Sequence, residues 1–125
     1  ENPTEHEKAC YAAYPEQGTI AEVEWFFDQY AEFSQERNAP VFCGEFGSFA
    51  PFAKHEDRVS WYTIVTNLLA ERGIARTSWD YYGGFGIFKM DWKAMRERRR
   101  MSKVSFPEDL DMDIVKAMGM NTELF

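Results

Sequence analysis

The sequence contains few of the residues that build disulfide frameworks or metal centres. Cys10 and Cys43 are the two cysteines of the chain, and His6 and His55 are its two histidines. Two distant cysteines are too few for a disulfide framework, and neither residue type has the spacing of a zinc site. We therefore predict no structural metal and no cofactor.

Long apolar runs and an excess of basic charge are also missing. No stretch approaches the roughly 18 apolar residues that span a bilayer, and no signal peptide pattern is present. The net charge of -7 disfavours a nucleic-acid surface, because phosphate contacts need a basic face. We expect a soluble chain with neutral substrates and with no nucleic-acid or membrane partner. Because it begins at Glu1 rather than at methionine, we expect a chain that was processed or cut from a longer one.

The composition is that of a folded chain. Hydrophobic residues make up 45% and aromatic residues 17% of the 125 residues, which fits a single domain with one core. Residues 1–18 are polar and contain the turn signals Asn2-Pro3 and Tyr14-Pro15, so we expect a loop or a ragged end there.

Helices and apolar strands alternate after this segment. Thr19 and Glu22 have capping-box spacing and start a predicted helix that ends near Arg37. The continuous apolar run at residues 41–43 predicts a strand that is buried on both faces. A second helix is predicted over residues 58–72, with Gly73 as its left-handed C-terminal cap, and a second strand over residues 74–81.

A third helix is predicted near the C-terminus, after a long connection. It should begin near Pro107, end at Gly119, and bury an inner face. That face consists of Leu110, Ile114, Val115 and Met118. Alternating helices and buried strands predict an α/β fold with a parallel sheet, because parallel neighbours need crossover connections.

Two residues at the predicted strand ends could carry chemistry. Glu45 follows the first strand between Gly44 and Gly47, and Trp79 stands at the end of the second. In parallel sheets and barrels the chemistry lies at the carboxyl ends of the strands, so both should face the same side. Glu45 is either a catalytic carboxylate or a solvated turn residue. Trp79 either stacks on a sugar or belongs to the core.

Other motifs are less specific. Aromatic residues crowd the two loops that leave the strands, which suits a binding cleft or a lid over the sheet. They are Phe46, Phe49, Phe52, Tyr81, Tyr82 and Phe85. The basic run at residues 96–100 suits a phosphate patch, but in an acidic chain a solvated or partner-facing loop is favoured. The "GGFGIF" stretch lacks the third glycine of a dinucleotide site.

The motifs "GEFG" and "WDYYGGFGIF", within residues 39–88, resemble the seventh and eighth strand–helix units of glycoside hydrolase family 5, the cellulase family. The likeness extends from residue 19 to about residue 120. It implies that residues 1–125 are a partial catalytic domain, the C-terminal part of a (β/α)8 barrel from its sixth to its eighth helix. The family nucleophile corresponds to Glu45 and the sugar-stacking aromatic to Trp79. Phe46 and Tyr81 are implied as further substrate-binding residues.

The implied activity is that of a retaining endo-β-1,4-glucanase, whose substrate is a β-linked polysaccharide or oligosaccharide. The resemblance also suggests a secreted or periplasmic location. The family's acid/base glutamate lies in an Asn-Glu-Pro motif, which this chain does not contain. Asp80 is not expected to replace it, because neighbouring strand residues point to opposite faces.

We therefore expect an incomplete barrel with open strand edges. These edges should be covered by the N-terminal barrel portion or by self-association. The alternative is a non-catalytic carbohydrate-binding or assembly module.

Overall fold

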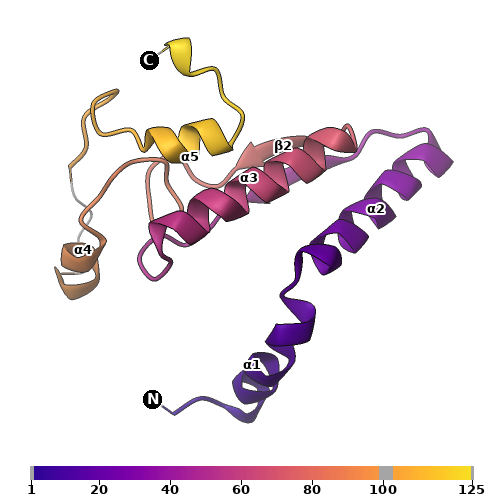
Figure 1. Cartoon of the computed structure of the whole chain (residues 1–125), viewed down its shortest axis with the longest axis horizontal. Coiled ribbons are helices and arrows are strands. Elements are labelled where there is room, and N and C mark those ends of the chain that lie inside the picture. Colours follow the sequence, from indigo (N-terminus) through magenta and orange to yellow (C-terminus); the bar gives the residue numbers. More distant parts are fainter. Residues whose placement is uncertain (1, 99–102, 125) are drawn as a thin grey trace. The chain divides into compact units, whose positions relative to one another are not determined.

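A computed structural model describes residues 2–98 and 103–124, and the chain forms two compact units, residues 1–40 and residues 41–125 (Figure 1). Within these described ranges, no helix is long and apolar enough to cross a membrane. The arginine side chains of the basic run at residues 96–100 lie outside the described part of the chain.

The first unit contains a helix that the sequence did not predict. Helix α1 (Glu5–Gln17) occupies most of the segment expected to be a loop, so that expectation was wrong. The reason is a capping box, in which the Glu7 N–H donates to Thr4 Oγ1 at 3.2 Å and the Thr4 N–H donates to Glu7 Oε2 at 2.7 Å. Pro15 is accommodated inside the helix.

The second helix of this unit confirms the capping prediction. Helix α2 (Ile20–Arg37) begins after Thr19, whose hydroxyl accepts from the Glu22 N–H at 3.2 Å. Asn38 ends it in the left-handed conformation, with φ of 48°.

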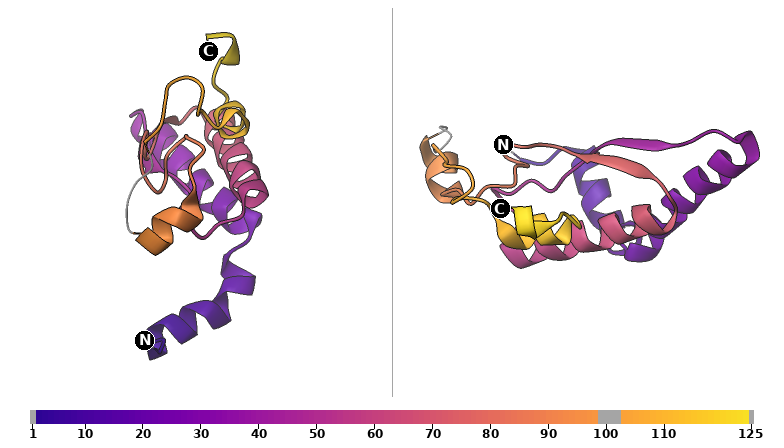
Figure 2. Two further views of the ribbon diagram at one scale, coloured as in Figure 1. Left: turned by 90° about the vertical axis from the view of Figure 1, so that its left-hand side faces the viewer. Right: turned by 90° about the horizontal axis from the view of Figure 1, so that it is seen from above.

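The second unit contains a parallel pair of strands with helices on one face (Figure 2). Strand β1 (Phe42–Phe46) pairs with strand β2 (Ala75–Ser78), and helix α3 (His55–Glu71) connects them. Helix α5 (Met112–Ala117) packs against α3. The predicted parallel pairing is therefore confirmed.

The ends of the predicted elements moved by a few residues. Helix α3 begins at His55 rather than at residue 58, and β2 is shorter than residues 74–81. Gly73 has φ of 66° and confirms the predicted cap, with the Ile74 N–H donating to the Leu69 carbonyl at 2.9 Å.

The C-terminal region differs more from the prediction. Helix α5 begins at Met112 and not near Pro107, because Asp111 caps it by accepting from the Ile114 N–H at 3.3 Å. Helix α4 (Trp92–Arg98) and the 3-10 helix η1 (Thr122–Leu124) lie in segments for which no helix was predicted.

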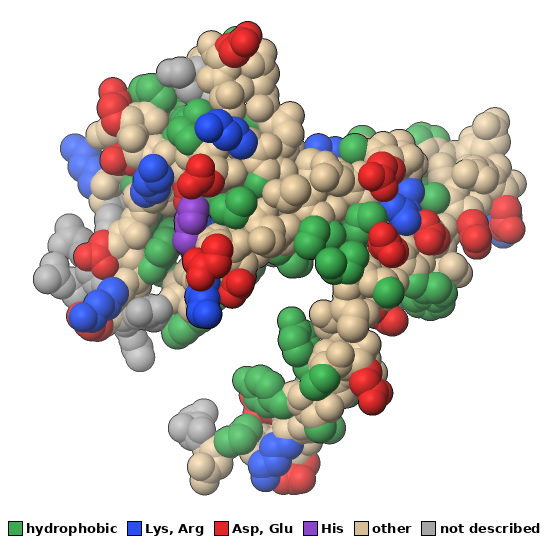
Figure 3. Space-filling model, in the orientation of Figure 1, with side chains coloured by type: hydrophobic (Ala, Val, Ile, Leu, Met, Phe, Trp, Pro, Cys, Tyr) green, Lys and Arg blue, Asp and Glu red, His purple; other side chains and the backbone are tan. Residues whose placement is uncertain are grey.

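The core of the second unit lies between α3, α5 and the segment that follows β2. Its buried cluster contains Tyr62, Ile87, Phe88, Leu110, Ile114 and Val115. The prediction that β1 is buried on both faces was wrong, since Phe42 is 60% exposed. The reason is that α3 covers one face of the sheet, which has two strands in the part of the chain that the structure describes. Figure 3 shows the hydrophobic side chains that remain at the surface.

Gly47, which follows β1, lies close to Trp79, which follows β2. A Cβ added at Gly47 would overlap the Trp79 carbonyl oxygen and would lie 3.1 Å from Phe85 Cδ1. At Gly44 the nearest atom to an added Cβ is Phe42 Cε1, at an ordinary 3.8 Å. A side chain is therefore excluded at Gly47 and tolerated at Gly44.

We predict that Gly47→Ala lowers the free energy of unfolding by about 1–3 kcal/mol, because the overlap is with backbone and cannot relax by a rotamer change. The matched change Gly44→Ala should leave that free energy within about 1 kcal/mol of the wild type. Denaturant unfolding of both variants measures the difference. Equal effects would contradict the close approach of Gly47 and Trp79.

The capping box of α1 should respond to pH. Hydrogen bonds from the Thr4 backbone N–H and the Thr4 hydroxyl hold the pKa of Glu7 below its ordinary value. The box thus stabilises the helix start above the ordinary pKa of a glutamate and is lost as pH falls through the lowered pKa.

We expect the pKa of Glu7, followed by NMR, to rise in Thr4→Ala. The equivalent change in α2, Thr19→Ala, should not alter it. An unchanged Glu7 titration in Thr4→Ala would show that the box does not form.

Candidate active site

The parallel strands bring Glu45 and Trp79 to the same edge of the sheet. Phe46 is paired with Ser78, and the Trp79 N–H donates to the Phe46 carbonyl at 2.8 Å. Glu45 precedes Phe46 in β1, and Trp79 directly follows β2. The sequence predicted that both loops leave at this edge, and the pairing confirms it.

An irregularity in β1 falls on the segment that contains Glu45. From Cys43 to Phe46 strand β1 advances by three residues, while β2 advances by two from Arg76 to Ser78. The extra residue of β1 is a β-bulge, which bends a strand and redirects a side chain. The register of Glu45 is therefore set by the bulge and not by simple strand alternation.

Three of the four predicted site residues are exposed at this edge. Glu45 is exposed, Trp79 is 52% exposed and Tyr81 is 59% exposed. The ring of Tyr81 lies edge-on to Phe88, with 5.1 Å between centroids. Two aromatic faces and one carboxylate are therefore open to a ligand from outside the chain.

Phe46, the fourth predicted residue, contacts helix α3. Its ring stacks on Trp61 with 6.0 Å between centroids and meets Tyr62 edge-on at 5.8 Å. The side chain is half-buried against the core. Phe46 thus anchors the end of β1, while its backbone carbonyl accepts the bond from Trp79.

The Glu45 carboxylate has no hydrogen-bond donor among the residues that the structure describes. The environment of the Asp80 carboxylate differs from that of Glu45. Because β2 ends at Ser78, the expectation that Trp79 and Asp80 alternate within a strand was wrong. The Trp79–Asp80 peptide bond is cis. The Asp80 carboxylate packs against Gly83, and its Oδ1 is buried with no hydrogen-bond partner among the described residues.

The two loops that leave the strands contact each other. The Ala50 N–H donates to the Gly84 carbonyl at 2.7 Å, and the ring centroids of Phe49 and Phe85 lie 5.0 Å apart. Phe52 packs on Phe49 at 5.8 Å. These rings pack on one another in the two loops, and the choice between a binding cleft and a lid stays a prediction.

Two buried polar side chains of α3 hold these loops, and the sequence reading missed this role. The Tyr62 hydroxyl accepts from the Ser48 N–H at 3.4 Å and donates to the Phe85 carbonyl at 3.2 Å. Arg58 Nη2 donates to the Gly86 carbonyl at 3.0 Å. Arg58 and Tyr62 are separated by one helical turn, so a polar pair on the buried face of the helix was the available signal.

Among the residues that the structure describes, this edge presents the exposed carboxylate of Glu45 and the exposed rings of Trp79 and Tyr81. The described residues whose side chains approach metal-ligand geometry are His55, Asp111 and Asp113, at the starts of α3 and α5. An exposed carboxylate next to flat apolar faces is suited to a sugar, which stacks on an aromatic ring by one face.

Comparison with known proteins finds similar sequences among endoglucanases. No protein-family model matches the chain. Endoglucanase H of Acetivibrio thermocellus is 38% identical over 65 residues, which are 52% of this chain and 7% of that protein. The chain spans a small fraction of the curated relatives that it matches.

Solved structures share the fold. Thermotoga maritima Cel5A in complex with cellobiose has a TM-score of 0.60 and 20% identity, over 79% of this chain and 27% of that one. A glycoside hydrolase 5 lichenase from Caldicellulosiruptor sp. F32 has a TM-score of 0.52 and 25% identity, over 82% of this chain and 25% of that one. The resemblance indicated by the sequence motifs is therefore confirmed: this chain is similar, in sequence and in fold, to the glycoside hydrolase family 5 cellulases.

Proposed function

We propose that this chain is the C-terminal, nucleophile-bearing part of a retaining glycoside hydrolase that cleaves β-1,4-linked glucans. Glu45 is the nucleophile and Trp79 is the platform for the sugar beside the scissile bond. The observation that carries the proposal is the bond from the Trp79 N–H to the Phe46 carbonyl, which joins the aromatic residue to the strand end that bears Glu45.

The proposed reaction begins with attack by a Glu45 carboxylate oxygen on the anomeric carbon. The bond from that carbon to the leaving oxygen breaks, and its electron pair stays on the oxygen, which takes a proton from an acid. Water then hydrolyses the glycosyl–enzyme ester and restores the carboxylate. Trp79 contributes apolar area and shape, which orient the ring for in-line attack.

The acid must come from elsewhere. A retaining pair of carboxyl groups lies about 5 Å apart, and the chain contains no Asn-Glu-Pro motif to supply the second group. In this proposal the preceding part of the barrel supplies it, together with hydrogen-bond donors for Glu45. That part would also cover β1, whose Phe42 ring is 60% exposed.

Residues 1–125 then form one portion of a single catalytic domain. The helices and strands from α2 to α5 would correspond to the sixth helix, seventh strand, seventh helix, eighth strand and eighth helix of the barrel. The lengths support this, because the chain covers 27% of Thermotoga maritima Cel5A.

The other two aromatic residues take different parts in the proposal. Tyr81 is exposed beside Trp79 and is available to a sugar ring. Phe46 acts mainly by holding the strand end against Trp61 and Tyr62.

The direct test is covalent trapping. The chain is incubated with a 2-fluoro cellobioside that carries a dinitrophenyl leaving group, whose departure needs little help from an acid. We expect intact mass to show one added glycosyl group, mapped by peptide sequencing to Glu45. Glu45→Gln should form no adduct, and the matched change Glu71→Gln, at the end of α3, should form it normally.

A second candidate is a carbohydrate-binding or assembly module without catalysis, and the missing acid motif favours it. This candidate predicts quenching of tryptophan fluorescence by cello-oligosaccharides with no adduct on the folded chain. An adduct on a residue other than Glu45, or adduct formation by Glu45→Gln, would contradict the assignment of the nucleophile.

A further inference from the structure

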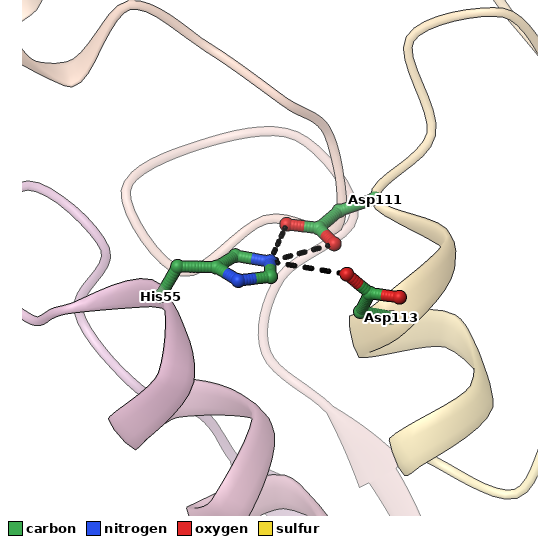
Figure 4. A group of neighbouring side chains, drawn as sticks. All are labelled: His55, Asp111 and Asp113. Carbon is green, nitrogen blue, oxygen red and sulfur yellow. Dashed lines mark hydrogen bonds and ion pairs between the residues drawn. The ribbon is translucent and has the colours of Figure 1, made fainter.

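Three side chains with metal-binding atoms converge where α3 and α5 begin (Figure 4). His55 is the first residue of α3, Asp111 caps α5, and Asp113 lies in the first turn of α5. His55 Nε2 lies 3.1 Å from Asp111 Oδ1, 3.0 Å from Asp111 Oδ2 and 4.0 Å from Asp113 Oδ2. One ligand atom from each residue lies within 4.8 Å of the others.

Asp111 is the buried carboxylate of this cluster. Asp111 is only 3% exposed, and a buried carboxylate is costly without a cationic partner. Its Oδ1 already accepts from the Ile114 N–H. Among the residues that the structure describes, His55 is its one ion-pair partner.

The spacing of the ligand atoms fits a small transition-metal ion. A tetrahedral zinc ion with bonds of about 2.0–2.2 Å holds its ligands roughly 3.3–3.6 Å apart. The separations of 3.0 Å and 4.0 Å from His55 Nε2 to the two carboxylates bracket that value. A neutral imidazole and two carboxylates also give a neutral site with a divalent cation.

The identity of the ligands favours zinc over the alkaline-earth ions. Calcium and magnesium prefer sites made only of oxygen atoms, whereas imidazole nitrogen is a preferred ligand of zinc and its neighbours. The imidazole of His55 therefore favours zinc or a neighbouring transition metal over calcium and magnesium.

A groove beside the cluster provides access. It has a volume of about 650 Å³ and is lined by His55 and Asp113 together with Asn67, Lys116 and Gly119. His55 and Asp113 have side chains that are 48% and 62% exposed, so both reach solvent while Asp111 is buried behind them. Water from this groove can occupy the remaining coordination position.

We propose that His55, Asp111 and Asp113 bind one Zn²⁺ ion, which links the start of α3 to the start of α5. Short-range spacing could not reveal the site, because His55 and Asp111 are 56 residues apart. The ion would join the two helix starts, and the proposal is independent of the proposed function at Glu45. Binding should stabilise the folded chain, because the unfolded chain does not hold the three ligands together.

The test is calorimetric titration of ZnCl₂ into the full chain after removal of metals by a chelator. It uses a His6→Ala, Cys10→Ser background, because His6 Nε2 and Cys10 Sγ lie 3.7 Å apart in α1 and could bind zinc weakly. We expect one zinc ion per chain and an increase in the melting temperature. His55→Ala should weaken binding by about 100-fold and Asp113→Asn by about tenfold.

Asp57→Asn is the matched control, since Asp57 is an exposed acid in the first turn of α3 but is not part of the cluster. It should bind zinc as the parent does. Circular dichroism verifies that each variant keeps its helices. Zinc binding that survives His55→Ala, or a folded parent chain that binds no zinc and gains no thermal stability from it, would overturn the proposal.

Discussion

The parallel pairing of β1 with β2 is the constraint on which the second unit depends. The last hydrogen bond of this pairing runs from the Trp79 N–H to the Phe46 carbonyl, at 2.8 Å. Because the strands are parallel, both loops leave at one edge, where Glu45 and the rings of Trp79 and Tyr81 are exposed. The bulge between Cys43 and Phe46 shifts the register of β1 against β2, and this shift sets the position of Glu45 in the strand.

Helix α3 holds the loops at this edge through its side chains. Arg58 and Tyr62 are almost fully buried, yet their polar atoms hold backbone carbonyls of the loop after β2. Gly47 permits the close approach of the first loop to Trp79, since any side chain there would overlap the Trp79 carbonyl. The same helix thus contributes to the core and holds the loops, so a regular element orients residues that lie on loops.

Local signals made part of this fold predictable. Thr19 and Gly73 marked helix ends through capping geometry, and the apolar spacing of Ile114 and Val115 marked the inner face of α5. The side-by-side placement of Glu45 and Trp79 followed from topology, because parallel strands have only one carboxyl edge. Glu45 as a nucleophile and Trp79 as a sugar platform came from the family resemblance and stay predictions.

The remaining features depend on information that the local patterns do not carry. Helix α1 was missed because Pro15 suggested a turn, although Thr4 and Glu7 have the same spacing as Thr19 and Glu22. The burial of β1 was overestimated because it depends on what covers a strand and not on the strand itself. The cluster of His55, Asp111 and Asp113 depends on the packing of α3 against α5 and has no signature along the chain.

The central claim, that the two strand ends form one sugar-binding edge, is tested most directly by NMR of the chain during titration with a cello-oligosaccharide. We predict that amide shifts concentrate in residues 44–49 and 79–86. They should disappear in Trp79→Ala and persist in Trp25→Ala, whose ring is equally exposed in the other unit. Shifts that lie elsewhere, or that persist unchanged in Trp79→Ala, would contradict the account.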